Sequence, residues 1–236
     1  MNRVPRQDAF LGPGPSPGWA MHLPRAPRPA LLVLRALLAL AAGSAFAQEA
    51  PPTWRAGVAV AAGTHRVFPF DERVYRHDVW GYKLFFNRHL ATTGPLGWEV
   101  QLEPSVYLDR HRLRDRSYLT PGWGPDYQAQ AARYARGETV REYAFNTGIV
   151  LRWQPTRTLS LFILASFGPA YVDTETEHLA SGLAFSDVAA VGVGLRLGRQ
   201  LIELRPGLRH VSNGELRFPN GGYDGVTLDL SVSVVP

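Results

Sequence analysis

Apolar and polar residues alternate along most of this chain, which restricts it to β-structure. From Trp98 to Leu108 the even positions are apolar, and the odd positions, Tyr107 aside, are polar. Because successive side chains of a strand point to opposite faces, this pattern predicts a strand with one apolar and one polar face. The same pattern recurs after residue 48 and predicts eight strands, at residues 53–64, 78–90, 97–110, 141–154, 158–173, 184–198, 200–212 and 223–235.

Alternation alone does not say which face points inward. A soluble β-protein buries its apolar face in a core, whereas a membrane barrel turns that face to lipid. Aromatic residues lie near the predicted strand ends on the apolar face, as an interfacial girdle requires: Trp54, Trp80, Trp98, Tyr143, Trp153 and Tyr171. The opposite face mixes charges with glycines, which suits a narrow polar lumen. The sequence predicts an all-β fold, an eight-stranded antiparallel transmembrane β-barrel of the outer membrane, with a soluble secreted β-protein as the alternative.

Residues 1–47 have the composition of a leader. Basic residues up to Arg28 precede an apolar run from Ala30 to Ala42, and Ala45-Phe46-Ala47 resembles a signal-peptidase site. The run is short for a bilayer and is interrupted by Arg35, which argues against a membrane anchor. We expect a cleaved signal peptide, with residues 1–20 an over-called start, and a single barrel domain at 48–236.

The overall charge gives little support for a nucleic-acid partner. The formal net charge is +5, but the five arginines and one aspartate of residues 1–47 account for +4 of it. The predicted barrel is therefore almost neutral, and no nucleic-acid partner is expected. The chain has no cysteine, which excludes disulfides and thiolate chemistry.

The lengths of the connections orient the predicted barrel. The links after the second, fourth and sixth strands are short, whereas the others are longer, and the longest runs over residues 111–140. Short turns of such barrels face the periplasm and long loops face outward. The ends of the first, third, fifth and seventh strands should therefore lie at the outer leaflet.

Polar residues occupy apolar positions at the outer end of the last two strands. In the seventh strand Leu204 and Leu208 face lipid, and His210 and Ser212 continue that register. Asp224 shares the register of the apolar residues in the eighth strand. Because a polar group facing hydrocarbon is costly, three of them at one place indicate a function.

These residue types are those of a serine hydrolase. His210 would take the proton of Ser212, and Asp224 would orient the imidazole and stabilise its charged form. Asn213 and Gly214 follow the nucleophile, so a backbone N–H or the Asn213 amide is the expected oxyanion donor.

The sequence here resembles the lipid A 3-O-deacylases of the PagL type. The resemblance rests on His210-Val211-Ser212-Asn213-Gly214 and on Pro219-Asn220-Gly221-Gly222-Tyr223-Asp224, and extends more loosely over residues 168–197. It implies that His210 and Ser212 are catalytic. The third member in that family is commonly glutamate, and Asp224 is one methylene shorter.

The resemblance also implies a substrate and a location. The chain would remove the ester-linked 3-hydroxyacyl chain at position 3 of lipid A, in the outer leaflet of a Gram-negative outer membrane, without a cofactor. The alternatives are a non-enzymatic, OmpA-like structural barrel and a phospholipase-type acyl hydrolase. The sequence leaves a monomer and a homodimer open.

Two further groups of residues have interpretations of their own. The histidines at 65, 77, 89, 111 and 178 show no ligand spacing, so we expect surface or girdle positions and no metal cluster. The link at 111–140 is rich in arginine, and it is either a solvated, partly mobile loop or a set of guanidinium groups that bind lipid A phosphates. The arginines in and beside it are Arg110, Arg112, Arg114, Arg116, Arg133 and Arg136.

Overall fold

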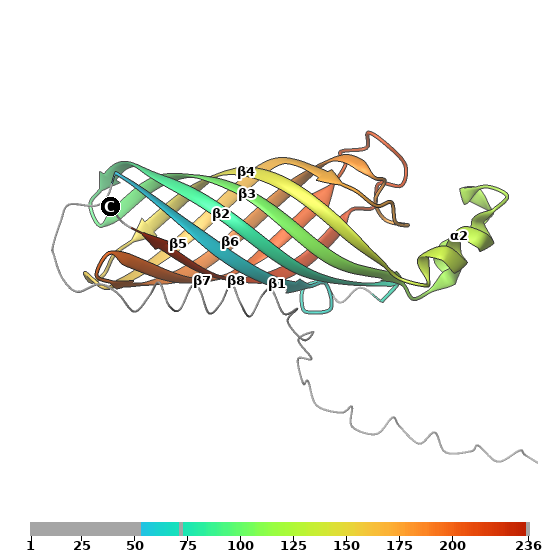
Figure 1. The fold of residues 1–236 in the computed structure, drawn as a ribbon, viewed down its shortest axis with the longest axis horizontal. Coiled ribbons are helices and arrows are strands. Elements are labelled where there is room, and N and C mark those ends of the chain that lie inside the picture. Colours follow the sequence, from blue (N-terminus) through green and yellow to red (C-terminus); the bar gives the residue numbers. More distant parts are fainter. Residues whose placement is uncertain (1–52, 71–72, 235–236) are drawn as a thin grey trace, which may run out of the picture.

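The computed structural model describes residues 53–70 and 73–234, so the predicted leader lies outside the described residues. Eight antiparallel strands form a closed barrel, in which β1 pairs with both β2 and β8 (Figure 1). This confirms the predicted fold. The strands are β1 (Trp54–Thr64), β2 (Tyr75–Thr93), β3 (Leu96–Leu113), β4 (Glu138–Trp153), β5 (Leu159–Val172), β6 (Gly182–Leu197), β7 (Gln200–Ser212) and β8 (Tyr223–Val234).

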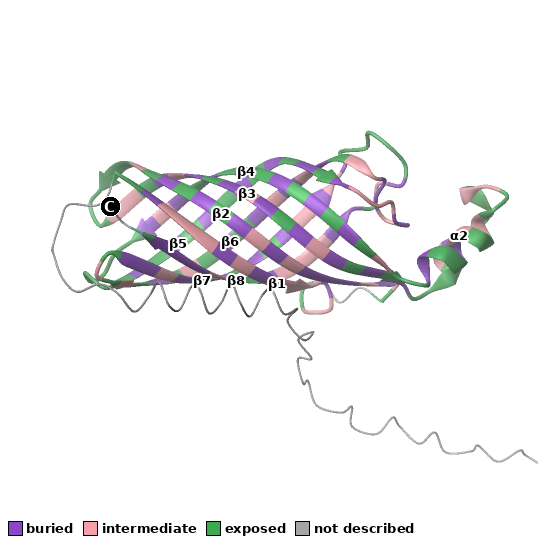
Figure 2. Ribbon diagram, viewed as in Figure 1, coloured by how far each residue is buried: buried purple, intermediate pink, exposed green. Residues whose placement is uncertain are grey.

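The apolar face of each strand points outward. Along β5 exposed and buried residues alternate one for one, and the exposed set includes Ile163, Phe167 and Tyr171. Figure 2 shows the same alternation around the barrel. An apolar exterior over this height is stable only where lipid covers it, as in an outer-membrane barrel.

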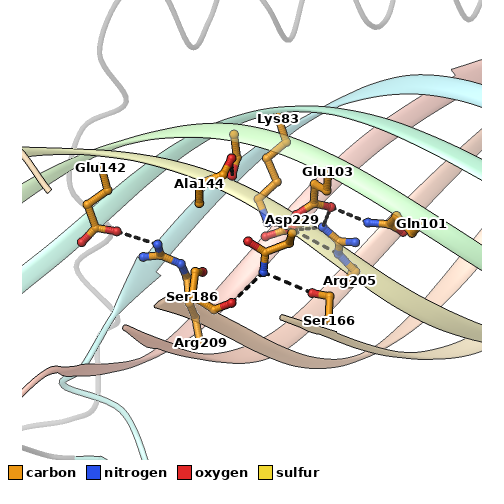
Figure 3. A network of polar contacts seen from close by, with 12 residues as sticks. Lys83, Gln101, Glu103, Glu142, Ala144, Ser166, Ser186, Arg205, Arg209 and Asp229 are labelled. Atoms are coloured by element: carbon orange, nitrogen blue, oxygen red, sulfur yellow. Dashed lines mark hydrogen bonds and ion pairs between the residues drawn. The ribbon is translucent and has the colours of Figure 1, made fainter. Parts of the chain in front are cut away.

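Charged residues fill the inside of the barrel as paired groups. Lys83 lies 3.1 Å from Glu103 and 2.7 Å from Asp229, and Arg205 binds the same two carboxylates (Figure 3). Nearer the short-turn end, Arg55 and Arg152 each bind Glu99 and Glu203. These pairs satisfy charges that would otherwise be costly to bury.

The connections alternate between short and long, as predicted. Short turns, at Gly94–Pro95, residues 154–158 and Gly198–Arg199, lie at one end, and the longer connections 65–74, 114–137, 173–181 and 213–222 lie at the other. By the usual orientation of such barrels, the end with the longer connections is the outer one.

The segment at 114–137, for which the sequence left two interpretations open, contains regular structure. It contains the 3-10 helices η1 (Arg116–Tyr118) and η2 (Pro121–Trp123) and the helix α2 (Tyr127–Tyr134), which projects beyond the barrel (Figure 1). Leu119, Ala131 and Tyr134 pack with Leu113 of β3 in a small apolar cluster. Within the described residues, no helix is long and apolar enough to cross a membrane.

The expectation of surface histidines is wrong for three of the five. His65, His77 and His111 are 0%, 2% and 3% exposed, inside the outer end of the barrel. For His77 and His111 the reason is that β2 and β3 extend about three residues further outward than predicted, so both are paired strand residues. His65 follows β1, and its ring is held by the carbonyl oxygens of His77 and Tyr75 on β2.

Candidate active site

One row of outward-facing residues crosses four neighbouring strands at the outer end of the barrel. Strand register pairs Phe167 of β5 with Asp187 of β6, Asp187 with His210 of β7, and His210 with Asp224 of β8. Residues paired in this way on one face have Cβ atoms about 4.5–5.5 Å apart. His210 therefore lies between two carboxylates.

His210 and Asp224 form a hydrogen bond. The Nδ1 atom of His210 lies 2.8 Å from Oδ1 of Asp224, and the side chains are 41% and 48% exposed. When Nδ1–H donates to this carboxylate, Nε2 carries the lone pair that can accept a proton. This arrangement brings together two of the three residues predicted from the sequence.

Ser212 lies on the same outward face, two residues beyond His210 on β7. Two positions along a strand separate the Cα atoms by about 6.6 Å. Among the described residues, no hydrogen bond joins Ser212 to His210. At this spacing the two side chains can reach each other. Their hydrogen bond is expected to form when substrate binds, as is common for catalytic hydrogen bonds.

Gly222 packs against both of these side chains. A Cβ atom at this position would lie 3.3 Å from Cε1 of His210, 3.3 Å from Cβ of Ser212 and 2.7 Å from the carbonyl oxygen of Val211. Its φ of +69° also favours glycine. The sequence analysis gave Gly222 no role, yet its lack of a side chain leaves room beside both His210 and Ser212.

The connection at 213–222 is held by one of the residues predicted to bind the oxyanion. Asn213 is 1% exposed, and its Nδ2 donates to the carbonyl oxygens of Arg217 (2.8 Å) and Pro219 (3.2 Å). In this arrangement the Asn213 amide shapes the loop and does not face the site. The hydrogen bonds of the described residues give the Gly214 N–H no acceptor, so this N–H is the stronger oxyanion candidate.

Asp187 is a site residue that the sequence analysis missed. Its neighbours on the outward face of β6 are Phe185, Ala189 and Val191, so a carboxylate here is an exception to an apolar series. The same reasoning that selected Asp224 would have selected Asp187.

A shallow apolar groove of about 430 Å³ begins at these polar residues and runs along the outside of the barrel. Its polar end contains Asp187, His210 and Asp224. Its sides are formed mainly by Ile149, Phe167 and Leu208, and Ala165 and Ala189 line it with small side chains. We call it the acyl groove, because its apolar lining suits a hydrocarbon chain.

The arginines of the outer segment are largely exposed, as both of their interpretations require. Some have protein partners: Arg133 lies 3.3 Å from Glu138, and Nε of Arg112 donates to the Ala135 carbonyl. Trp123 of η2 contacts Phe218, with ring centroids 4.5 Å apart. This contact joins the arginine-rich segment to the connection that carries Gly222.

Among the described residues, three side chains that could together bind a metal ion come close at one place. They are His77, Asp109 and Glu142, which lie in the lumen and not on this outward face.

Comparison with known proteins identifies the family. The crystal structure of the outer membrane enzyme PagL matches with a TM-score of 0.50 and 16% identity, over 74% of this chain and 97% of that one. Neisserial surface protein A matches with a TM-score of 0.44 and 10% identity, over 80% of this chain and 100% of that one. No curated protein matches. The family described as lipid A 3-O-deacylase (PagL) matches residues 56–233, so the chain belongs to this family, whose place is the outer membrane of Gram-negative bacteria.

Proposed function

We propose that this chain hydrolyses the ester linking the hydroxyacyl chain at position 3 of lipid A, with Ser212 as nucleophile, His210 as general base and Asp224 as the orienting acid. The observation that carries the proposal is the His210–Asp224 hydrogen bond on the lipid-facing surface, in register with Ser212 and at the end of the acyl groove. A hydrolase site that faces the acyl layer meets lipid esters in preference to soluble ones.

The reaction begins with attack of Ser212 Oγ on the ester carbonyl carbon, while Nε2 of His210 takes the hydroxyl proton. Asp224 accepts from Nδ1 and stabilises the imidazolium that forms. The tetrahedral intermediate collapses, the bond to the sugar oxygen breaks, and His210 returns the proton to that oxygen. Water then attacks the acyl-serine with His210 again as base, releasing the fatty acid and restoring Ser212.

The negative oxygen of the intermediate needs hydrogen-bond donors. The Gly214 N–H lies two residues after Ser212 in a turn where Gly214 and Glu215 both have positive φ. Asn213 supports this turn through its two bonds to carbonyl oxygens. We therefore assign oxyanion binding to the Gly214 N–H and a positioning role to Asn213.

The acyl groove supplies the binding energy for the chain that is released. The chain would lie over the paired residues Leu208 and Ala189, with its ester at His210. Burial of each methylene contributes about 0.8 kcal/mol where water is displaced, and less where lipid is displaced. Fit to the groove therefore matters more than simple burial.

The alternatives explain the site less well. An OmpA-like structural barrel has no use for an imidazole and two carboxylates facing lipid, where each costs free energy. A phospholipase-type acyl hydrolase would use the same residues on a different ester, so only the substrate distinguishes it.

The experiment is hydrolysis of lipopolysaccharide by the purified barrel in detergent. We expect release of 3-hydroxy fatty acid, with lipid A losing one hydroxyacyl chain in its mass spectrum, and loss of that activity in Ser212→Ala and His210→Asn that still fold. Ser186→Ala is the matched control, because Ser186 pairs with Val211 but points into the lumen. Release of fatty acid from phospholipid alone, with lipid A unchanged, would support the phospholipase, and no release from either would support the structural barrel.

A further inference from the structure

A cluster of histidine and carboxylate side chains lies inside the outer end of the barrel, on the opposite side of the wall from the active site. His77 of β2, Asp109 of β3 and Glu142 of β4 come from three adjacent strands and point into the lumen. They are 2%, 0% and 0% exposed. One potential ligand atom from each lies within 4.8 Å of the others.

Three carboxylate oxygens of this cluster have no donor except a proton that Asp109 and Glu142 could share. Among the described residues, neither oxygen of Asp109 accepts a hydrogen bond, and Oε1 of Glu142 accepts none either. Nε2 of His77 lies 3.9 Å from Oδ2 of Asp109, which is too long for a hydrogen bond. Buried carboxylate oxygens without donors are costly, so something further is expected to bind there.

The charges around the cluster favour a cation. The carboxylates of Asp109, Glu142 and Glu177 bring three negative charges when ionised. Arg209 forms an ion pair with Glu142 (Figure 3). Glu177 instead binds Nε2 of His111 at 2.7 Å. A proton shared between two carboxyl groups would relieve part of this charge, and a divalent ion would relieve more and also occupy the imidazole nitrogen.

We propose that His77, Asp109 and Glu142 bind a divalent metal ion in the lumen, with zinc as the best match. One imidazole nitrogen and two carboxylate oxygens form a ligand set that zinc accepts, with bonds of about 2.0–2.2 Å. In a triangle with sides of 4.8 Å the centre lies about 2.8 Å from each corner, so each ligand would move inward by less than about 1 Å. Side-chain rotation can supply a shift of this size.

The ion would brace the two strands that carry the active site. Tyr223, the residue before Asp224, stacks on the His77 ring with centroids 4.3 Å apart and an angle of 16°. Arg209, the residue before His210, binds Glu142. His210 and Asp224 are therefore each next in sequence to a residue whose side chain touches a proposed ligand, so the ion would stiffen this part of the wall from inside.

The test measures metal content in tag-free, full-length protein. The chain is unfolded in urea and refolded in detergent with Zn²⁺, or with a chelator, and free metal is then removed. We expect about one zinc per chain by mass spectrometry of the elements and a higher unfolding temperature than for the chelator-treated protein. A zinc content below about a tenth per chain would overturn the proposal.

Variants locate the ion. Asp109→Asn keeps the shape of the side chain and should lose zinc, whereas Glu103→Gln, on the same face of β3 but deeper in the lumen, should keep it. Retention of zinc by Asp109→Asn would contradict the assignment, for example through binding at the outward His210 and Asp224. If Asp109→Asn does not fold, wild-type protein refolded with Co²⁺ should show the visible absorption of cobalt bound by nitrogen and oxygen, and absence of these bands would overturn the proposal.

Discussion

Replacement of Asp224 by asparagine tests the third member of the proposed triad. The substitution keeps the size of the side chain and removes its charge. The new amide could offer either its oxygen or its NH₂ group to Nδ1 of His210, and the second choice leaves the proton on Nε2, where it prevents that atom from acting as a base. We expect a fall in kcat/KM with an intact barrel.

The size of the effect follows from the ion pair formed during the reaction. Opposite unit charges 4 Å apart attract by about 1 kcal/mol in bulk water and about 4 kcal/mol at an effective dielectric constant of 20. His210 and Asp224 are 41% and 48% exposed in the isolated barrel, so screening keeps the value below the upper figure. A loss of about 2–3 kcal/mol corresponds to about 30- to 160-fold in kcat/KM.

The assay is release of 3-hydroxy fatty acid from lipopolysaccharide under single-turnover conditions. Asp187→Asn is the matched control, because it makes the same change on the other side of His210. We expect Asp187→Asn to reduce the rate by less than Asp224→Asn, since the hydrogen bond of His210 is made to Asp224. Asp224→Glu should stay active, because the family commonly has glutamate here. A loss of less than about threefold in Asp224→Asn, or a larger loss in Asp187→Asn, would refute the reasoning.

Three other substitutions test further parts of the structure. Gly222→Ala should reduce kcat by about 100-fold or more, because the added Cβ displaces His210 and Ser212. Gly94→Ala is its control, because Gly94 has a similar φ of +59° but no atoms near the added Cβ, and it should leave activity unchanged. Ala189→Leu should obstruct the acyl groove and lower kcat/KM for a long acyl chain. The loss should stay below about 60-fold, which is the value for three methylenes transferred from water, and it should be smaller for short acyl chains when lipid A species of different chain length are compared. Arg205→Met removes one of the cations that pair with the buried carboxylates of Glu103 and Asp229. It should reduce the free energy of unfolding in urea by about 3–5 kcal/mol, while each folded molecule keeps its activity. An unchanged urea midpoint would contradict the role of this ion pair.

The barrel could be predicted because its determinants are local in sequence. Within the height of the bilayer, each residue faces either lipid or the lumen, so alternation reports the fold directly. The same pattern placed His210, Ser212 and Asp224 on the outward face, and the structure agrees.

The position of Asp187 beside His210 was also accessible from the sequence. The turn at Gly198–Arg199 pairs Leu197 with Gln200, and counting back along both strands pairs Asp187 with His210. The partner of His210 on β8 could not be counted in this way, because the 213–222 connection is too long to fix the register.

The lumen cluster was missed for a physical reason. Beyond the bilayer both faces of a strand are polar, as in Tyr75-Arg76-His77-Asp78, so alternation no longer marks the strand and its end is placed too early. The ligands also come from three strands, and His77 and Glu142 are far apart in sequence. Their proximity depends on the pairing of β2, β3 and β4, which residue spacing within one segment cannot show.

Covalent labelling of Ser212 tests the central claim most directly. A fluorophosphonate transfers its phosphonyl group to an activated serine oxygen with loss of fluoride, and peptide mass spectrometry then locates the group. The account predicts label on the peptide that contains Ser212, loss of lipid A hydrolysis in proportion to labelling, and no labelling of His210→Asn. Inactivation with the label on another residue, or full hydrolysis by Ser212→Ala, would contradict it.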